Sequence, residues 1–153
     1  MRSGVLDVGS NTVHLVAVNA TVGGRPTPMS DWKTPLRLVE QLDDDGNIHA
    51  KGVKRLISAV KEASELGKKL DCDEFIAFAT SAVRSAPNSD EVLALVEKET
   101  GVHLEILSGE EEARLTFLAV RRWYGWSAGR ITNIDIGGGS LELSTGSDEE
   151  PEM

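Results

Sequence analysis

The chain contains LDVGSNT at Leu6–Thr12 and a second copy of that phrase, IDIGGGS, at Ile134–Ser140. In each copy apolar residues flank an aspartate, a glycine follows two positions later, and a small hydroxyl residue follows three positions after that glycine. Each copy lies between two apolar runs. This pattern predicts a strand, a tight turn and a returning strand, and it occurs twice in one chain.

The turn in each copy has the parts of a phosphate-binding cradle. Glycine lets the backbone approach an anion, N–H groups and hydroxyls donate hydrogen bonds to it, and the aspartate can hold a metal ion or a water. A single copy is explained equally well as an ordinary hairpin in which Asp and Gly serve the turn. Because the internal spacing is repeated, we interpret the copies as two related lobes that face one phosphate-bearing ligand.

Composition and charge narrow the class of protein. The chain has 153 residues, of which 40% are hydrophobic and 27% charged, as in globular proteins with one domain, or one and a fraction. The net charge of −9 argues against a protein that binds nucleic acid or a membrane surface, which would carry a basic face. It still allows an anionic substrate, because a divalent cation can neutralise much of the charge of such a ligand.

Cysteine and histidine usage gives no sign of disulfides or zinc. Cys72 is the single cysteine, which fits a reducing cytoplasm, and we interpret it as a small, partly buried residue. The three histidines lack partners at the spacing of a zinc site. No apolar run is long enough for a transmembrane helix. We therefore expect a cytoplasmic protein.

Hydrophobic periodicity predicts three strands, then alternating helices and strands, then a final hairpin. The first strands are expected at Arg2–Val8, Thr12–Ala20 and within Thr27–Glu40, with a Gly-Gly hairpin loop at Thr21–Pro28. Helices are expected at Ala50–Leu70, Ser89–Thr100 and Gly109–Trp123, strands at Glu74–Thr80 and Val102–Leu107, and a loop at Ser81–Asn88. Pro28 and Pro35 mark the third strand as an edge strand. This order predicts an α/β fold, a mixed sheet with helices on its faces.

The final hairpin, Ile131–Ile136 and Leu141–Thr145, repeats the opening of the chain, but no third strand or helix follows it. Two strands alone are marginally stable in water. We therefore expect the 153 residues to be a piece of a longer protein. The hairpin should fold back on its own domain, pair with a second copy as a homodimer, or be poorly ordered.

Four motifs in order resemble one protein family. They are VLDVGSNTVHLV (Val5–Val16), FATSAVR (Phe78–Arg84), SGEEEARLTFLAV (Ser108–Val120) and NIDIGGGSLEL (Asn133–Leu143). The chain resembles the Ppx/GppA family of exopolyphosphatases and guanosine pentaphosphate phosphohydrolases. Its RRWYGWSAGR segment is similar to that of short actinobacterial exopolyphosphatases.

The resemblance covers essentially the whole chain and implies the actin-like ATPase (ASKHA) fold. Residues 1–128 would form an N-terminal ribonuclease-H-like domain with a five-stranded mixed sheet and flanking helices. Residues 129–153 would form the first hairpin of a second, truncated domain of the same fold.

Hydrolysis of a phosphoanhydride needs a group that activates water, and a carboxylate near a helix start could serve. Glu110, Glu111 and Glu112 offer three candidates at the start of the helix that Ser108 caps. Glu111 fits a capping box, and Glu110 fits the helix dipole. The resemblance implies that the catalytic residue is Glu112.

The resemblance also assigns ligands for phosphate. Arg84, which follows a strand, would otherwise be interpreted as a surface cation, but the family pattern implies a phosphate-binding arginine. The first cradle would be formed by Gly9, Ser10, Asn11 and Thr12, and the second by Gly137, Gly138, Gly139 and Ser140.

The metal ligands are expected to be carboxylates. Asp7 and Asp135 are the paired turn aspartates, and Glu142 matches a second carboxylate of the family motif. Together they would hold Mg²⁺, or another divalent cation such as Mn²⁺, directly or through water.

Three functions remain open at this point. The resemblance implies an exopolyphosphatase, a hydrolase that releases terminal orthophosphate from inorganic polyphosphate. The alternatives are hydrolysis of guanosine pentaphosphate and a noncatalytic module that binds polyphosphate or a nucleotide. Glu112 and Arg84 together favour an enzyme.

Overall fold

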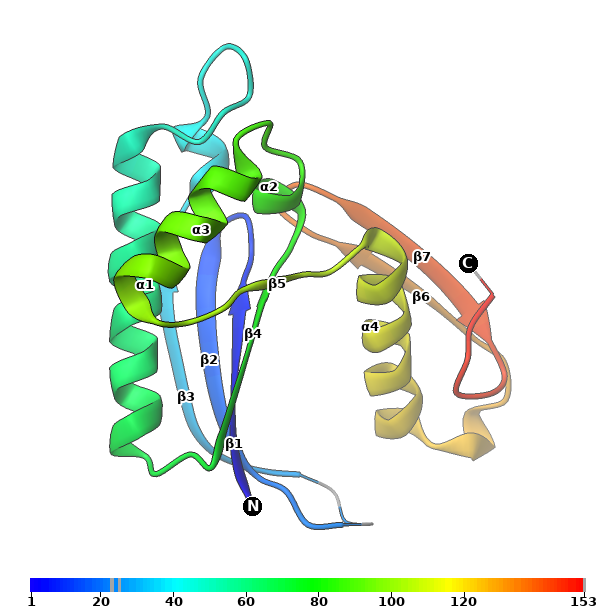
Figure 1. Ribbon diagram of the computed structural model, residues 1–153. Helices are drawn as coiled ribbons and strands as arrows, with labels where there is room; N and C mark the ends of the chain where they lie inside the picture. The colour runs from blue at the N-terminus through cyan, green and yellow to red at the C-terminus, as the bar shows by residue number, and fades with distance from the viewer. Residues whose placement is uncertain (23, 25, 153) are drawn as a thin grey trace. The chain divides into compact units, whose positions relative to one another are not determined.

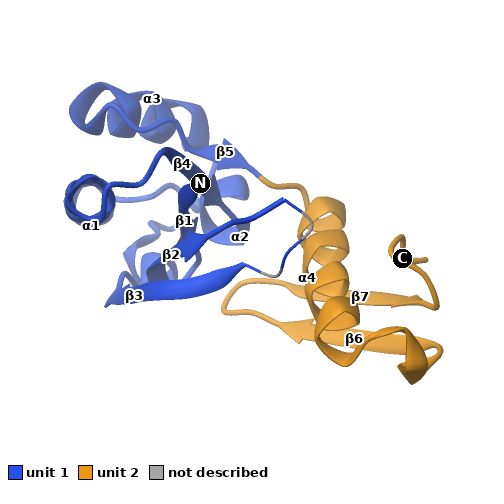
Figure 2. Cartoon of the chain, turned by 90° about the horizontal axis from the view of Figure 1, so that it is seen from below, with its two compact units in different colours: residues 1–106 blue, residues 107–153 orange. Residues whose placement is uncertain are grey.

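The structure is a computed structural model that describes residues 1–22, 24 and 26–152. It divides into two compact units, residues 1–106 (unit 1) and residues 107–153 (unit 2), shown in different colours in Figure 2. Each unit is described by itself.

Unit 1 is built on a five-stranded sheet with the order β3-β2-β1-β4-β5. The first three strands are an antiparallel meander, and β4 and β5 add in parallel, because helices cross over between them (Figure 1). The strands are β1 (Arg2–Val8), β2 (Thr12–Asn19), β3 (Thr27–Pro35), β4 (Glu74–Ala79) and β5 (Glu105–Ile106). The expected meander and mixed sheet are confirmed.

Two helices, α1 (Ala50–Lys69) and α3 (Ser89–Thr100), lie on the same side of this sheet (Figure 1). They cover the face that carries the alternate apolar residues of β1 and β2. The resulting core includes Leu6, Val8, Val13, Leu15, Leu56, Val60, Val92 and Val96, all nearly or fully buried. A short 3₁₀ helix, η1 (Leu38–Gln41), joins β3 to α1 through an acidic turn.

The edge position expected for β3 is confirmed. Pro28 and Pro35 lie at its ends, where a missing N–H costs least, and the ladder with β2 shifts register between Ala17 and Val18. The hairpin loop expected at Thr21–Pro28 includes Gly23 and Arg25, which lie outside the described residues.

Two local expectations were wrong. The segment Val102–Leu107 was expected to be a strand, but only Glu105–Ile106 pairs with β4, since the alternation of Val102 and Leu104 reflects burial in the core. The expected loop at Ser81–Asn88 begins with a helical turn, α2 (Ser81–Arg84). The carbonyl of Thr80 accepts hydrogen bonds from the N–H groups of Val83 and Arg84, and no breaker residue interrupts the turn.

Unit 2 consists of α4 (Gly109–Tyr124), a 3₁₀ turn η2 (Trp126–Ala128) and a two-stranded sheet of β6 (Ile131–Ile136) and β7 (Leu141–Gly146). Helix α4 packs against both strands. The division between units falls before α4, whereas the sequence places the domain boundary at residue 128. That boundary stays a prediction, because it concerns a second domain of which these residues would be only the beginning.

Arg121 anchors α4 to the hairpin. Its side chain is fully buried, its Nη2 donates to the carbonyl of Gly146 at 2.7 Å, and its guanidinium lies 5.7 Å from the ring centroids of both Phe117 and Trp126. The Phe117 ring also lies so close to Gly146 that an added Cβ there would meet it at 3.2 Å. The hairpin therefore folds back on the helix that precedes it, one of the outcomes expected from the sequence.

The acidic segment after β7 also returns toward the hairpin. Thr145 and Glu152 exchange backbone hydrogen bonds of 2.9 and 2.7 Å. Ion pairs join Arg114 to Glu150, Arg122 to Glu149, and Arg130 to Glu152. Exposed pairs of this kind add little stability singly, so the backbone bridge matters more for the path of the segment.

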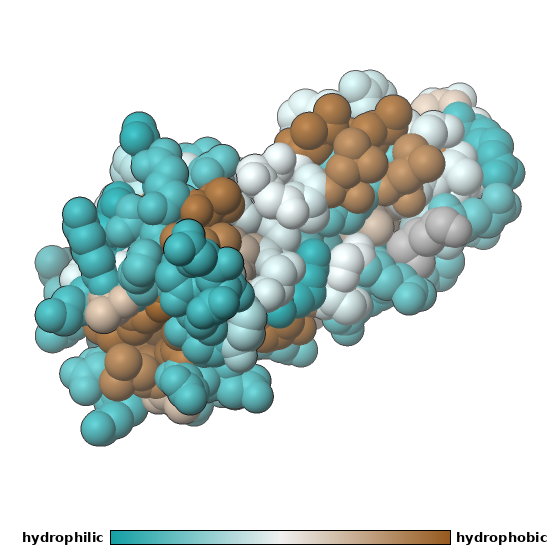
Figure 3. Space-filling view, turned by 90° about the horizontal axis from the view of Figure 1, so that it is seen from above, coloured by the Kyte–Doolittle hydropathy of each residue, from teal (hydrophilic) through white to brown (hydrophobic). Residues whose placement is uncertain are grey.

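The side of the hairpin that faces away from α4 is apolar and exposed. Apolar side chains form a continuous brown area in the right-hand part of the surface in Figure 3. On the hairpin, the exposed apolar residues are Ile134, Ile136, Leu141 and Leu143, with exposed fractions of 55–76%. None of the described helices is long and apolar enough to cross a membrane.

Candidate functional site

The first turn, Gly9–Thr12, lies at the carboxyl end of β1. The N–H of Gly9 donates to the carbonyl of Thr12 at 2.9 Å, which closes the turn. The carbonyls of Ser10 and Asn11 accept hydrogen bonds from the N–H groups of Leu36, Arg37 and Leu38. Within the described part of the chain, the N–H groups of Ser10 and Asn11 have no partner. Two backbone donors are thus left for an anion.

Glycine is not required at this turn by backbone conformation. Gly9 and Gly137 are not among the glycines with positive φ. A Cβ built on either would lie 3.4 Å from the carbonyl oxygen of the residue three positions later, an ordinary contact. The value of glycine here is therefore the open space above the turn, which lets a ligand approach the backbone.

The segment that carries Arg84 lies beside the first turn. The hydroxyls of Ser10 and Ser81 share a buried hydrogen bond of 2.8 Å, and the N–H of Thr80 donates to the carbonyl of Val8 at 3.1 Å. Arg84 lies in the last position of α2 and is half-buried. Strands β1 and β4 are parallel neighbours, so the turn and the Arg84 segment occupy the same edge of the sheet, where ligands of α/β folds gather.

The sequence predicts that the Ser10 side chain binds phosphate, but in the structure this hydroxyl is buried. Its side chain is 4% exposed, and its hydroxyl is engaged by Ser81. The backbone N–H is the part of Ser10 that remains available to a ligand. Asn11 is exposed, and Gly9 and Thr12 are half-buried.

Asp7 precedes the first turn and is exposed on the sheet face that does not form the core. It lies directly opposite His14 in the β1–β2 ladder. The His14 Nε2 is 2.9 Å from Asp31 Oδ1, so the imidazole is oriented by a carboxylate on β3. Polar side chains thus continue across three strands on the open face.

The second turn repeats the geometry of the first. The N–H of Gly137 donates to the carbonyl of Ser140 at 3.0 Å. Gly137, Gly138 and Gly139 are exposed and Ser140 is half-buried. Asp135 and Glu142 are directly opposite each other in the β6–β7 ladder, and Glu142 is 8% exposed. Like charges at directly opposite positions destabilise a strand pair, so a bound cation would relieve a local cost here.

The three glutamates in the first turn of α4 have different surroundings. The expected capping box is confirmed: the Glu111 carboxylate accepts from the N–H and hydroxyl of Ser108, at 2.8 Å each, and the Ser108 hydroxyl accepts from the N–H of Glu111. The hydrogen bond from the Ser108 backbone N–H is the main reason that the pKa of Glu111 is lowered. Glu110 is exposed. Glu111 is thus occupied in the cap, while Glu112 is half-buried.

The face of α4 that carries Glu112 meets strand β6. Thr116 lies one helical turn after Glu112, on the same face. Its hydroxyl donates to Asp135 Oδ2 at 3.3 Å. Within unit 2, Thr116 thus links the helix face that carries Glu112 to Asp135, which is directly opposite Glu142.

Thr116 was not identified from the sequence. The sequence feature that could have identified Thr116 is a hydroxyl residue one turn after Glu112, between the buried Ala113 and Phe117. A polar residue at that spacing, next to an apolar stripe, indicates a second side chain directed at the same site.

The expected metal ligands fall into two sets. Asp7 belongs to unit 1, and Asp135 and Glu142 belong to unit 2. Among the described residues, no group of three or more His, Cys, Asp or Glu side chains could hold a metal ion. The Asp135–Glu142 pair still fits Mg²⁺, which usually keeps several waters and takes one or two carboxylates together with substrate phosphates.

Comparison with known proteins gives the family. A model of the Ppx/GppA phosphatase family matches residues 16–153. The chain belongs to the Ppx/GppA phosphatase family. It is 63% identical over all 153 residues to Exopolyphosphatase 1 of Mycobacterium tuberculosis and 61% identical to Exopolyphosphatase 1 of Mycobacterium leprae. It spans 44% and 45% of the length of those relatives.

Solved structures agree with the fold. The crystal structure of an exopolyphosphatase from Cytophaga hutchinsonii matches 99% of this chain with a TM-score of 0.90 and 30% identity, over 48% of its own length. The Ppx/GppA family member of Aquifex aeolicus matches the whole chain with a TM-score of 0.85 and 27% identity, over 49% of its own length. The actin-like, ribonuclease-H-like fold implied by the four motifs is confirmed.

Proposed function

We propose that the chain is the N-terminal part of an exopolyphosphatase that releases orthophosphate from the end of inorganic polyphosphate. The observation that carries this proposal is the identity of 61–63% with relatives named Exopolyphosphatase 1, which extends over both glycine turns. Within each unit the structure supports it. Unit 1 presents backbone donors and an arginine at one sheet edge, and unit 2 places Asp135 directly opposite Glu142 on its hairpin.

In the proposed reaction, water attacks the terminal phosphorus while the bond from that phosphorus to the bridging oxygen breaks. Glu112 accepts a proton from the attacking water, and the bridging oxygen leaves on the shortened chain. The N–H groups of Ser10 and Asn11 and the guanidinium of Arg84 would hold phosphate oxygens, because directed donors stabilise the charge on the transferred group.

Asp135 and Glu142 would hold Mg²⁺, and Asp7 on unit 1 stays a proposed metal ligand. When bound, the ion would neutralise charge on the phosphoryl oxygens. Thr116, by donating to Asp135, would fix the orientation of that carboxylate. We propose the cytoplasm as the compartment, in line with the single cysteine.

The test is phosphate release from polyphosphate with Mg²⁺ and with excess chelator. It needs a protein of the relatives' length, made by joining these 153 residues to the C-terminal part of Exopolyphosphatase 1 of M. tuberculosis. We refer to it as the extended protein. Release that depends on Mg²⁺ supports the proposal. Faster phosphate release from guanosine pentaphosphate than from polyphosphate at equal concentration would favour the alternative function, hydrolysis of guanosine pentaphosphate.

The matched variants are Glu112→Gln and Glu111→Gln in the extended protein. Loss of a general base typically costs about 10²–10⁴-fold in turnover, so Glu112→Gln should lose most activity and keep polyphosphate binding. Glu111→Gln changes the same charge one residue away and should keep most turnover, since its carboxylate caps the helix. Near-normal turnover of Glu112→Gln would move the catalytic role to another carboxylate.

A further inference from the structure

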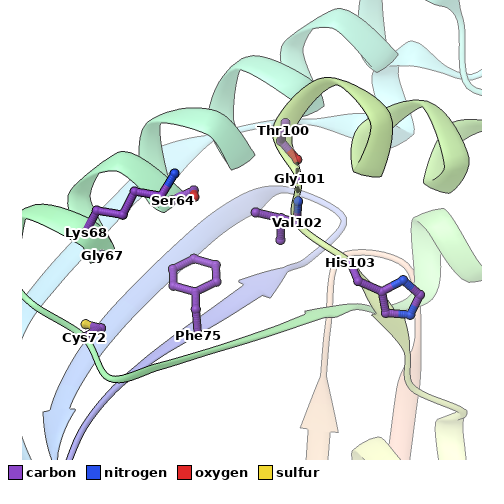
Figure 4. A pocket seen from close by; sticks show the side chains of 9 residues that line it. All are labelled: Ser64, Gly67, Lys68, Cys72, Phe75, Thr100, Gly101, Val102 and His103. Atoms are coloured by element: carbon purple, nitrogen blue, oxygen red, sulfur yellow. Dashed lines mark hydrogen bonds between the residues drawn. The ribbon is translucent and has the colours of Figure 1, made fainter.

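A cavity of about 390 Å³ lies in unit 1, away from the glycine turn. It is bounded by the last turns of α1, the start of β4 and the segment that follows α3. Figure 4 shows Phe75 in the middle of the lining residues, with Cys72 and His103 on opposite sides of it. The cavity is at the amino end of β4, whereas Thr80 and Arg84 follow its carboxyl end.

The floor of the cavity is an aromatic ring held between two glycines. A Cβ added at Gly67 on α1 would come within 2.8 Å of the Phe75 ring, and one added at Gly4 on β1 within 3.0 Å. Only glycine at these positions lets the ring lie this close to both backbones. The ring is therefore fixed in place while it still lines the cavity.

The lining is mixed: Ser64 and Thr100 add hydroxyls, while Val102 and Cys72 supply the apolar part. Val102 lines the cavity and is 8% exposed. Burial raises the pKa of the Cys72 thiol, so near neutral pH this side chain is uncharged and acts as a small apolar group. Ring, valine and thiol together offer a surface suited to a flat apolar group.

The rim carries one positively charged side chain, Lys68. Lys68 lines the cavity, and among the described residues no carboxylate pairs with its ammonium group. His103 lines the opposite side, with its Nδ1 at 3.3 Å from Glu97 Oε2. No Asp or Glu is among the lining residues of the described chain.

The carboxyl ends of α1 and α3 lie near the cavity, and they disfavour an anionic ligand only weakly. Carbonyls at helix ends attract cations, but here several are already satisfied. The N–H groups of Leu70 and Cys72 donate to the carbonyls of Leu66 and Gly67, and the N–H of Gly101 donates to that of Glu97. Asp71, Asp73 and Arg2 act on Cys72 from outside the lining, and their charges partly offset one another. Among the described residues that line the cavity, the permanently charged group is the ammonium of Lys68.

We propose that this cavity binds a small aromatic carboxylate, with its ring on Phe75 and its acid group on Lys68. The volume is near the lower end of the range of about 300–1,000 Å³ that small-molecule sites span, which suits one or two fused rings with a short acidic arm. The site is independent of the proposed reaction.

The experiment is a titration followed by ¹H–¹⁵N spectra of the 153-residue chain, with indole-3-acetate as the anionic probe. Indole and tryptamine are the neutral and cationic probes of matched shape. Indole-3-acetate should shift the amides of Lys68, Phe75 and Gly101 saturably, and should bind about threefold or more tightly than either control, as expected for one exposed ion pair. No saturable shift at these amides, or equal binding of tryptamine, would overturn the proposal.

Charge reversal tests the role of Lys68. Lys68→Glu should abolish the preference for indole-3-acetate over tryptamine. Lys69→Glu is the matched control, because Lys69 is the next residue on α1, is exposed and does not line the cavity. If Lys68→Glu leaves the preference unchanged, or Lys69→Glu removes it equally, the assignment of the acid group to Lys68 is wrong.

Discussion

The two hairpins share a backbone pattern but differ in what covers them. In the first, Leu6 is opposite Leu15 and Val8 is opposite Val13; in the second, Ile134 is opposite Leu143 and Ile136 is opposite Leu141. The four residues of the first hairpin are at most 1% exposed, and those of the second are 55–76% exposed. The same phrase therefore specifies the strands and the turn, while burial depends on the helices that other segments supply.

The opposite faces of the hairpins differ as well. Against α4, the second hairpin places polar groups, including Asn133, Glu142 and Ser144. Several buried polar atoms in this layer have no hydrogen-bond partner: Nε and Nη1 of Arg121, Nδ2 of Asn133 and Oγ of Ser144. Such atoms cost stability, whereas the core of unit 1 is apolar. The second hairpin is thus the less stable of two similar structures.

The largest expected effect concerns activity. We expect the 153-residue chain to hydrolyse polyphosphate at least about 100-fold more slowly than the extended protein, because small misplacements of catalytic groups can cost that much. The apolar face of the second hairpin is exposed in the 153-residue chain, so its glycine turn would be held less firmly than in the extended protein. Phosphate release per mole of protein, measured for both under the same Mg²⁺ concentration, checks this.

Circular dichroism of the 153-residue chain serves as the control, since slow hydrolysis by an unfolded chain would say nothing about the hairpins. Equal activity of the folded chain and the extended protein would mean that hydrolysis needs no residues beyond these 153. The difference in covering would then have no consequence for function.

The next effect separates the hairpins by stability. Leu6→Ala should lower the free energy of unfolding of the chain by about 2–5 kcal/mol, as is usual for a large buried side chain. Ile134→Ala, at the corresponding position of the second hairpin, should change it by less than about 0.5 kcal/mol, since Ile134 is 60% exposed. Urea unfolding of both variants measures the contrast, and equal losses would show that the apolar face of the second hairpin is covered in solution.

The sequence predicted most of the fold because its patterns are local. The two Asp-Gly turns, the period of α1 and the Ser108–Glu111 capping box each depend on residues a few positions apart. The short β5 and the helical turn at Ser81–Arg84 could not be predicted, because pairing of Val102–Leu104 and hydrogen bonding to Thr80 depend on tertiary neighbours.

The candidate site was predictable only in part. Motifs indicated Arg84, Glu112 and both turns, and the structure places Arg84 beside the first turn and Glu112 one helical turn from Thr116. That Ser81 engages the Ser10 hydroxyl depends on a contact between segments 71 positions apart, for which a single sequence carries no signal.

A smaller effect tests whether the glycine turns bind phosphate. Gly9→Ala should leave the stability of the extended protein within about 0.5 kcal/mol of the parent, because the new Cβ meets only the Thr12 carbonyl at 3.4 Å. Turnover should nevertheless fall about tenfold or more, since the methyl group occupies space above the backbone donors. Gly137→Ala probes the second turn in the same way, as its Cβ would meet Ser140 at 3.4 Å.

Steady-state kinetics measure the turnover of both glycine variants, and thermal unfolding measures their stability. A variant that loses activity and stability together would point to damage of the turn itself. A Gly9→Ala variant with parental turnover would exclude a close approach of phosphate to the first turn.

The smallest effect concerns two buried serines. Ser144 is 1% exposed and its Oγ has no partner, whereas Ser10 is 4% exposed and shares a 2.8 Å hydrogen bond with Ser81. Removing an unsatisfied buried hydroxyl relieves a desolvation cost, so Ser144→Ala should raise the free energy of unfolding by about 1 kcal/mol. Ser10→Ala should lower it by about the same amount, because Ser81 would lose its partner. Urea unfolding of the 153-residue chain measures both, and a loss of stability in Ser144→Ala would show that a bound water or another group satisfies this hydroxyl in solution.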